Sequence, residues 1–496
     1  MQGKKLRTTK LFYQLSLEDL VPVDHIYRTI EQQLDLRFLY KRTRRFYGKE
    51  GQQSIDPVVF FKMCLLGYLN NITGDRPLCR YCTDSIAARW FLGYDIDEPL
   101  PVHSTLSRTR ALLGEAVYME VFRQVLDLCV DQGMVSGKRQ AVDSALVKAN
   151  ASVDSMTRTV IMEDASVYCR QVIQTNAEDT EPTEDPPPTP PSEQPPNMLS
   201  AVALPIPETP VKRKRSNKTH RSTSDPDARL ARKPNKPGAM YYHAQISVDA
   251  QEGVIVAGLA NYADLNDHES LVPLLNQSLA NLAGHHLPLK EVLADSQYNT
   301  YPTLAQIEAA GITPYMNNPS GYKREREGFT YDASRDSYWC SEGKELRFQG
   351  VSKSRGKYAN RKYASRPADC VGCPLRSQCL SGKSSYKSIT HSSGKPDYDR
   401  MYERLQTDKG RRMLAKRKGI VEPVLGTLLH HNAMRKTYAR GMAAASKHVM
   451  MACTAFNLRK WLKKAGKPPL KVAQIVRIAT IHYFELFLPQ IRYYFS

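Results

Sequence analysis

Three acidic residues stand at positions where a carboxylate could do chemistry. Asp143 follows Val142 inside an apolar stretch that is typical of a buried strand, and Asp295 ends the apolar run EVLAD. Glu422 lies directly before Pro423 in KRKGIVEPVLGTLL. An ionised acid on a buried strand is costly unless it is paired or bound to a metal ion. Because carboxylates that converge at strand ends suit Mg²⁺, we predict a magnesium site made of these three acids.

Two metal ions held in this way can activate an attacking hydroxyl and stabilise the leaving oxygen of a phosphodiester. For any one of the acids taken alone, a role as a turn or cap residue is the more common one. Proline suits the first turn of a helix, so Glu422 is also a candidate helix cap. We therefore expect a helix to start close to Glu422, with Val424, Leu425, Leu428 and Leu429 on its buried face.

The net charge of the chain points to a polyanionic partner. Its 496 residues include 70 Lys and Arg against 50 Asp and Glu, a formal charge of +20. Nucleic acid is the expected partner, because neutralisation of phosphates by Lys and Arg drives sequence-independent affinity. A basic protein without such a partner is the alternative. The start, MQGKKLRTTK, lacks a secretory signal, and no run of about 18 apolar residues exists, so we expect a cytoplasmic protein without a membrane partner.

The elements that must position the acids can be read from the periodicity of apolar residues. The first 135 residues are predicted to be all helical, with caps at Ser16 and Ser104 and a stop at Gly133. From Lys138 the pattern changes to a strand around AVDSALVKANAS, then a β-hairpin at AMYYHAQISVDAQEGVIVAGLANYAD. Next come a helix, the strand EVLAD, a second helix, the strand ITPYMN and further helices. This mixture predicts an α/β domain.

These patterns divide the chain into seven segments. They are a helical N-terminal DNA-binding domain at 1–135, the first part of the core at 136–175, a low-complexity insert at 176–236, the continued core at 237–319, a cysteine-containing insertion at 320–397, a C-terminal part of the core with Glu422 at 398–463, and a C-terminal segment at 464–496. The insert is acidic and proline-rich, then strongly basic. Neither half can bury a core, so we expect it to be disordered or loosely docked.

Four cysteines of the insertion have a spacing that suits zinc. They are Cys340, Cys370, Cys373 and Cys379, the last three in CVGCPLRSQC. A C-x-x-C pair is typical of a tetrahedral Zn²⁺ site, and Cys340 is the expected fourth ligand of a structural zinc ion. Reduced thiols without a metal are an equally weighted alternative. Cys79 and Cys82 are also C-x-x-C but have no nearby partners, so we expect them to pack in a helical core.

Several strings, taken in order, resemble those of bacterial insertion-sequence transposases of the DDE class. AVDSALVKANAS, VLADSQYNT and GIVEPVLG stand at the positions of the first Asp, the second Asp and the Glu. LVPVDHIYRTI, IDPVVFFKMCLLGYL and PVHSTLSRTRALLG resemble the helical domain that precedes the core in one branch, and SDPDARLARK is similar to the segment after the first strand in that branch. The resemblance covers most of the chain outside the proline-rich insert.

The resemblance implies a fold and an activity. The fold is an RNase H-like catalytic core interrupted by insertions and preceded by an all-α domain. The activity is cleavage of DNA at the terminal inverted repeats of an insertion sequence and joining to target DNA, with Mg²⁺ or Mn²⁺ on Asp143, Asp295 and Glu422. It further implies at least a homodimer in the synaptic complex, and a bacterial, nucleoid-associated location.

One signature of many relatives is incomplete here. A Tyr–Arg–Glu–Lys pattern commonly surrounds the Glu, but Lys418 lies four residues before Glu422 and Leu429 seven after it. The phosphate contacts are therefore expected from other basic residues, namely Arg417, Lys418, Arg435 and Lys436. In the N-terminal domain, Arg108 and Arg110 come shortly after the predicted Ser104 cap, where side chains can reach groove edges or phosphates.

Three other classes of protein remain open from the sequence. One is a catalytically inactive or regulatory DNA-binding protein derived from a transposase, although all three acids are present. Another is a stand-alone RNase H-like nuclease that cuts without strand transfer. The third is a zinc-dependent nucleic-acid-binding regulator.

Overall fold

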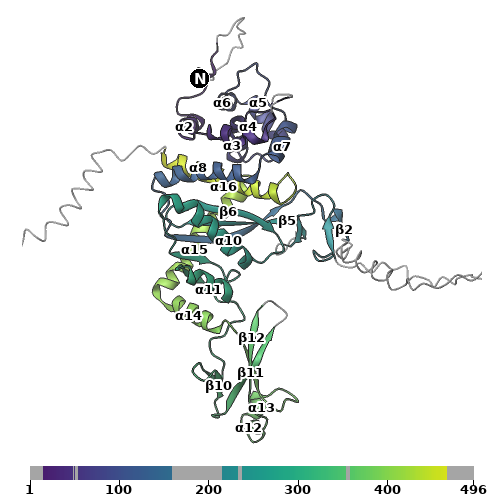
Figure 1. Ribbon diagram of the computed structural model, residues 1–496, viewed down its shortest axis with the longest axis vertical. Coiled ribbons are helices and arrows are strands. Elements are labelled where there is room, and N and C mark those ends of the chain that lie inside the picture. Colours follow the sequence, from purple (N-terminus) through teal and green to yellow (C-terminus); the bar gives the residue numbers. More distant parts are fainter. Residues whose placement is uncertain are drawn as a thin grey trace, which may run out of the picture.

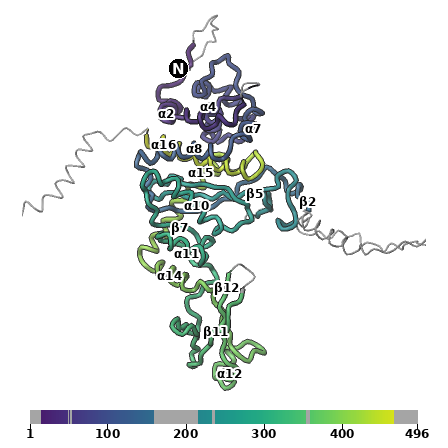
Figure 2. Tube along the Cα trace, viewed as in Figure 1, coloured from purple at the N-terminus to yellow at the C-terminus, as the bar shows by residue number. Residues whose placement is uncertain are grey.

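The computed structural model describes residues 15–48, 50, 54–158, 215–232, 237–353 and 358–465. Figure 1 shows three stacked parts: helices near the N-terminus, a central sheet covered by helices, and a smaller sheet at the opposite end. The tube in Figure 2 passes through these parts in order, until its last helix returns to lie between the first two. Within the described ranges, no helix combines the length and the apolar character needed to cross a membrane.

The first part is helical, as predicted. Its helices are α1 (Leu17–Leu20), α2 (Ile26–Gln33), α3 (Phe38–Thr43), α4 (Pro57–Leu69), α5 (Asp75–Asp84), α6 (Ile86–Leu92), α7 (His103–Leu112) and α8 (Glu115–Asp131). Ser16 caps α1, since its side chain accepts a hydrogen bond from the N–H of Glu18. The prediction for α7 is wrong, because this helix begins at His103, after Val102, which makes no side-chain cap. Cys82 of α5 is buried in the core, as expected.

The central sheet holds β1 (Arg139–Lys148), β5 (Ala239–Asp249), β6 (Ile255–Tyr262), β7 (Glu291–Ala294) and β8 (Thr313–Met316). They lie in the order β6-β5-β1-β7-β8. The pairs β6–β5 and β5–β1 are antiparallel, and β1–β7 and β7–β8 are parallel. This order and polarity are those of an RNase H-like core, so the expected fold class is confirmed.

Helices cover the sheet and connect it to the first part. They are α10 (Asp267–Leu282), α11 (Tyr301–Ala309), α14 (Lys395–Gln406), α15 (Asp408–His431) and α16 (Met442–Ala465). The last of these, α16, packs against β6 on one side and against α8 and α4 on the other. Helix α15 crosses β1, β7 and β8. The apolar residues of the helical part and of the core therefore form one continuous cluster of buried side chains.

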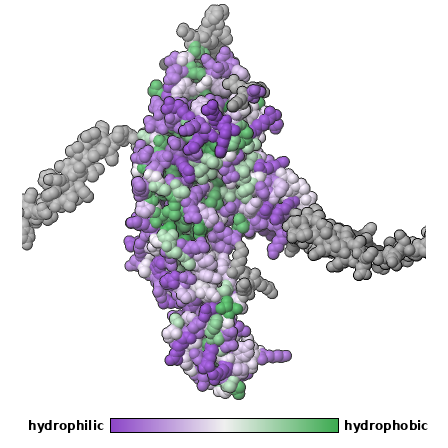
Figure 3. Space-filling model, viewed as in Figure 1, coloured by the Kyte–Doolittle hydropathy of each residue, from purple (hydrophilic) through white to green (hydrophobic). Residues whose placement is uncertain are grey.

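The cysteine-containing insertion forms a second, antiparallel sheet with the order β13-β12-β11-β10-β9. Its strands are β9 (Phe329–Asp332), β10 (Ser337–Cys340), β11 (Glu345–Lys353), β12 (Ala359–Ala364) and β13 (Ser388–Ser392). Two short helices, α12 (Ala368–Val371) and α13 (Arg376–Cys379), lie between β12 and β13. A separate small core holds this sheet together, made of Tyr338, Leu346, Tyr363 and Ile389. Figure 3 shows mainly hydrophilic side chains on its outer surface.

Part of the low-complexity insert is ordered, which corrects the prediction for residues 215–232. Within it, β3 (His220–Ser222) pairs with β2 (Met156–Arg158), and β4 (Arg229–Ala231) adds to β5. Asp225 is fully buried and accepts a hydrogen bond from the Tyr242 hydroxyl at 2.6 Å. A short polar segment is thus fixed by adding to strands that already exist. The rest of the insert, and residues 466–496 of the C-terminal segment, lie outside the described residues.

Candidate active site

Two of the predicted acids lie at the same edge of the central sheet. In the parallel pair, Arg139 of β1 lies opposite Glu291 of β7, and Ala141 opposite Leu293. The same register, continued two residues further, sets Asp143 opposite Asp295, directly after the end of β7. Asp143 thus lies inside β1, at the level where β7 ends, and ligands of open α/β sheets bind beyond the carboxyl ends of strands. Burial chiefly, and also the nearby charge of Asp295, raise the pKa of Asp143 above its usual value.

Arg417 of α15 pairs with Asp143. Its Nη1 donates a hydrogen bond to Oδ2 of Asp143 at 2.9 Å, and the Ser144 N–H donates to Oδ1 at 2.8 Å. The two side chains are only 13% and 18% exposed, so this ion pair is largely shielded from water. Arg417 was expected to contact DNA phosphate. That contact stays a prediction, and the guanidinium supplies a positive charge to the first aspartate.

A group of buried polar side chains behind the two aspartates was not predicted from the sequence. The hydroxyl of Tyr298 donates to Oε1 of Gln245, and Nε2 of Gln245 donates to Oδ1 of Asp267 at 2.7 Å. Gln245 and Tyr298 are completely buried. Nε2 of His243 lies 3.4 Å from the same Asp267 oxygen, while burial lowers the His243 pKa. A glutamine inside the apolar strand AQISV was the available signal. These contacts fix β5, α10 and the loop after Asp295 relative to one another.

Glu422 lies inside α15, not at its start, so the predicted helix boundary is wrong. The helix begins at Asp408, where Thr407 accepts a hydrogen bond from the N–H of Gly410. Pro423 is an interior residue of this helix, and Glu422 is exposed. One proline costs a backbone hydrogen bond, but the long apolar face of α15 stabilises the helix on both sides of it.

The described residues hold no group of three or more His, Cys, Asp and Glu side chains close enough to bind a metal ion. Asp143 and Asp295 are neighbours, but Glu422 does not join them in such a group. Nor does the structure gather the four cysteines of the insertion. Cys340 ends β10, where its Sγ accepts the N–H of Lys344, while the other three lie in and around α12 and α13. The zinc prediction rests on the spacing alone.

The predicted DNA-binding residues fall into two groups. Arg108, Lys418 and Arg435 are exposed, as a phosphate contact requires. Lys436 is partly exposed. Arg110 is partly exposed as well, and its contact with DNA stays a prediction. It lies in the last turn of α7, and its guanidinium forms a two-point ion pair with Asp75 of α5, at 2.6 and 2.8 Å. Its charge is used to join two helices.

Because Arg110 forms an ion pair and Arg108 is exposed, we expect their substitutions to differ in their effect on stability. Replacing Arg110 by alanine leaves the Asp75 carboxylate unpaired and should lower the free energy of unfolding by about 2 kcal/mol, between the values typical of exposed and buried pairs. The Arg108→Ala variant should keep wild-type stability, because that side chain is exposed. Denaturant unfolding of both purified variants measures this. Equal stability of the two would show that the Arg110–Asp75 pair contributes nothing.

Comparisons with known proteins bear on this arrangement. Residues 15–112 match a family model described as "Transposase domain (DUF772)". Residues 339–462, which include Arg417 and Glu422, match one described as "Transposase DDE domain". Both family models therefore describe transposases, and each covers less than half of the chain. The first match covers the helices α1 to α7, and the second runs from β10 into α16.

Among solved structures, this chain is similar to one described as "Cryo-EM structure of piggyBac transposase synaptic complex with hairpin DNA (SNHP)". The match covers 92% of this chain and 84% of that chain, with 11% sequence identity and a TM-score of 0.32. A likeness at that level carries no argument about the site. The search of the curated proteins gave no match.

Proposed function

We propose that this chain is a DDE transposase that cuts DNA at the ends of its own element and joins those ends to target DNA. The proposal assigns divalent metal binding to Asp143, Asp295 and Glu422. The observation that carries it is the placement of Asp143, inside β1, level with Asp295, which directly follows the neighbouring parallel strand β7, close enough for one charge to shift the pKa of the other acid. DDE transposases use divalent metal ions, typically Mg²⁺.

The donor set fits such an ion. Two carboxylates are hard oxygen ligands of the kind that Mg²⁺ takes, and both are only partly exposed. Asp143 already binds a cationic group, the Arg417 guanidinium, which offsets the cost of burying its charge. When bound, divalent ions supply an activated hydroxyl and stabilise the leaving oxygen of a phosphodiester.

The side chains of the chain itself divide the remaining work. Asp143, inside β1, and Asp295, directly after β7, are held in place by the sheet and supported by the buried Gln245–Tyr298 hydrogen bond. The Arg417 guanidinium, which pairs with Asp143, would bond the scissile phosphate. Glu422, on the same helix as Arg417, would hold a second divalent ion and orient the water or 3′-hydroxyl. The helical N-terminal domain recognises the inverted repeats, and a dimer or larger assembly holds two ends together.

The decisive experiment uses the inverted repeats that flank the gene in its genomic DNA. Labelled duplexes carrying these ends are incubated with the full chain, Mg²⁺ and a plasmid target. We expect cuts at the ends and covalent joining to the plasmid, with Mn²⁺ also supporting both and Ca²⁺ supporting binding with little cleavage. Cleavage without joining would favour a stand-alone nuclease, and end binding without cleavage a regulatory protein.

A further inference from the structure

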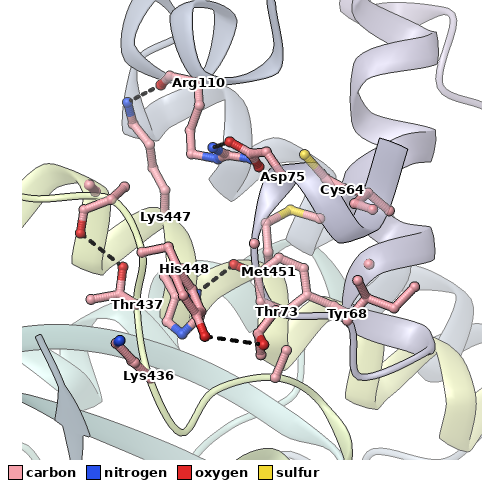
Figure 4. A pocket seen from close by; sticks show the side chains of 18 of the residues that line it. Cys64, Tyr68, Thr73, Asp75, Arg110, Lys436, Thr437, Lys447, His448 and Met451 are labelled. Atoms are coloured by element: carbon pink, nitrogen blue, oxygen red, sulfur yellow. Dashed lines mark hydrogen bonds and ion pairs between the residues drawn. The ribbon is translucent and has the colours of Figure 1, made fainter. Parts of the chain in front are cut away.

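A small pocket lies where the helical N-terminal domain meets the core. We call it the interdomain pocket. One wall comes from α4, α5, α7 and α8, and the other from α16 and the segment 433–439 that precedes it. Figure 4 shows Arg110 and Asp75 facing Lys447 and His448 across it. Its volume of about 70 Å³ suits a group of a few heavy atoms, since pockets for whole small-molecule ligands are several times larger.

The lining carries more positive than negative charge. Of its three cationic side chains, Arg110 is neutralised by Asp75. The other two, Lys436 and Lys447, have no carboxylate within ion-pair distance among the described residues, although Glu115 attracts Lys447 from further away. Lys447 is only 6% exposed, and its Nζ donates to the backbone oxygen of Arg110 at 2.8 Å. Burial lowers its pKa, so a bound anion would stabilise its charged form.

A buried hydroxyl also lacks a partner in this pocket. The Tyr118 side chain is 1% exposed, and its hydroxyl makes no hydrogen bond within the described part of the chain. The Nζ of Lys447 lies 5.6 Å from the centre of the Tyr118 ring. A buried hydroxyl that donates no hydrogen bond lowers the stability of the protein, unless a group bound in the pocket accepts a hydrogen bond from it. Two ammonium groups and a free hydroxyl together suit an anion with several acceptor oxygens.

The pocket is also tied to the strand that carries Asp143. Next to Lys436, the N–H of Thr437 donates to the oxygen of Lys148, and the N–H of Lys148 donates to the oxygen of Arg435. Lys148 ends β1, five residues beyond Asp143. At roughly 3.3 Å per residue this is about 17 Å. Successive phosphates of one DNA strand advance about 3.4 Å along the duplex axis, so about five of them span that distance.

We propose that the interdomain pocket binds one backbone phosphate of DNA, about five nucleotides from the scissile bond, through Lys436, Lys447 and the Tyr118 hydroxyl. The identity of this occupant rests on the proposed function, whereas the preference for a phosphate group rests on the lining alone. The same phosphate would contact both the helical domain and the core, and so fix one against the other when DNA is bound.

The first test uses inorganic phosphate and the full chain, without DNA. Phosphate should raise the melting temperature of the wild type, and this rise should shrink in Lys447→Met and Tyr118→Phe. Tyr118→Phe removes only an unpaired hydroxyl, so it should fold as well as the wild type. The matched control is Lys290→Gln, an exposed lysine just before β7, at the other end of the sheet from Asp143. No phosphate effect in the wild type, or equal effects in all variants, would overturn the proposal.

The second test identifies DNA as the source of the phosphate. The logarithm of duplex affinity is plotted against the logarithm of salt concentration, and the slope should become shallower by about 0.9 in Lys436→Gln and stay unchanged in Lys290→Gln. A duplex with one methylphosphonate five nucleotides from the cut should bind more weakly to the wild type than the unmodified duplex does. The same change should not further weaken binding by Lys436→Gln. If phosphate raises the melting temperature but the salt-dependence slope of Lys436→Gln equals that of the wild type, the pocket binds a free anion and not DNA. Neither test needs cleavage, so failure of the proposed chemistry is a separate result.

Discussion

Replacing Asp143 or Asp295 by asparagine is expected to abolish DNA cleavage and leave DNA binding close to that of the wild type. Asparagine keeps the shape of the side chain but removes the charge that a divalent ion needs. Loss of about 4 kcal/mol of transition-state stabilisation corresponds to about a thousandfold slower cleavage. Binding depends instead on the excess of basic residues in a chain of charge +20. Single-turnover cleavage of labelled ends, alongside a filter-binding titration, measures both quantities.

Asp249 provides a matched control for these variants. It is also a buried acid of the central sheet, but it ends β5 opposite Gln140, three residues before Asp143 in β1. Its carboxylate accepts hydrogen bonds from the backbone N–H groups of Gly137 and Gln251, so its role is to hold a turn. Asp249→Asn should therefore lower the melting temperature and keep cleavage. Wild-type cleavage by Asp143→Asn or Asp295→Asn would remove that residue from the proposed site.

The positions of the two aspartates in their strands could be predicted, but their adjacency could not. Apolar runs on either side of Asp143 and before Asp295 give strands from local pattern alone. The contact between them depends on a parallel pairing of segments about 150 residues apart. No local signal encodes such a register. The resemblance to RNase H-like transposases supplied that expectation, and the strand order of the sheet agrees with it.

The errors at the helix boundaries have a common physical cause. Ser104 and Pro423 are good start signals, yet each lies inside a helix that begins earlier, at His103 and Asp408. Capping preferences are worth about 1 kcal/mol, which the burial of a long apolar face easily outweighs. The same limit applies to Arg110, whose partner Asp75 lies on another helix. The position of Arg110 close to a predicted helix start does not indicate that it pairs with an acid of another helix.

The insert shows where composition fails as a guide. Residues 215–232 are as polar as their neighbours, but they contain two three-residue strands, β3, which pairs with β2, and β4, which adds to β5 of the central sheet. The decisive contact is the buried Asp225, which bonds the Tyr242 hydroxyl and accepts the N–H of Gly441 at the start of α16. An ordered segment need not bury apolar surface of its own when another strand offers a free edge.

Glu422 is the residue for which structure and resemblance differ most, and its substitution gives the second large expected effect. It is exposed on the middle of α15, on the helix whose Arg417 reaches Asp143. We expect Glu422→Gln to reduce cleavage and joining at least a hundredfold, about 2.7 kcal/mol, with normal end binding and an unchanged melting temperature. An exposed side chain without a structural partner has little influence on stability. The same single-turnover assay and a thermal melt measure these effects.

Asp408→Asn is the control on the same helix. Asp408 is the other acid of α15, is 87% exposed and pairs only with Arg411 of its own first turn. Its loss should leave cleavage unchanged, because it lies more than three helical turns from Glu422. If both variants cleave like the wild type, the third carboxylate of the site is a different residue, and Asp267 is the next candidate, because its buried carboxylate connects through Gln245 to Tyr298 behind the two aspartates. If only Glu422→Gln is inactive, Glu422 belongs to the site, and α15 must bring it toward Asp143 when DNA and metal bind.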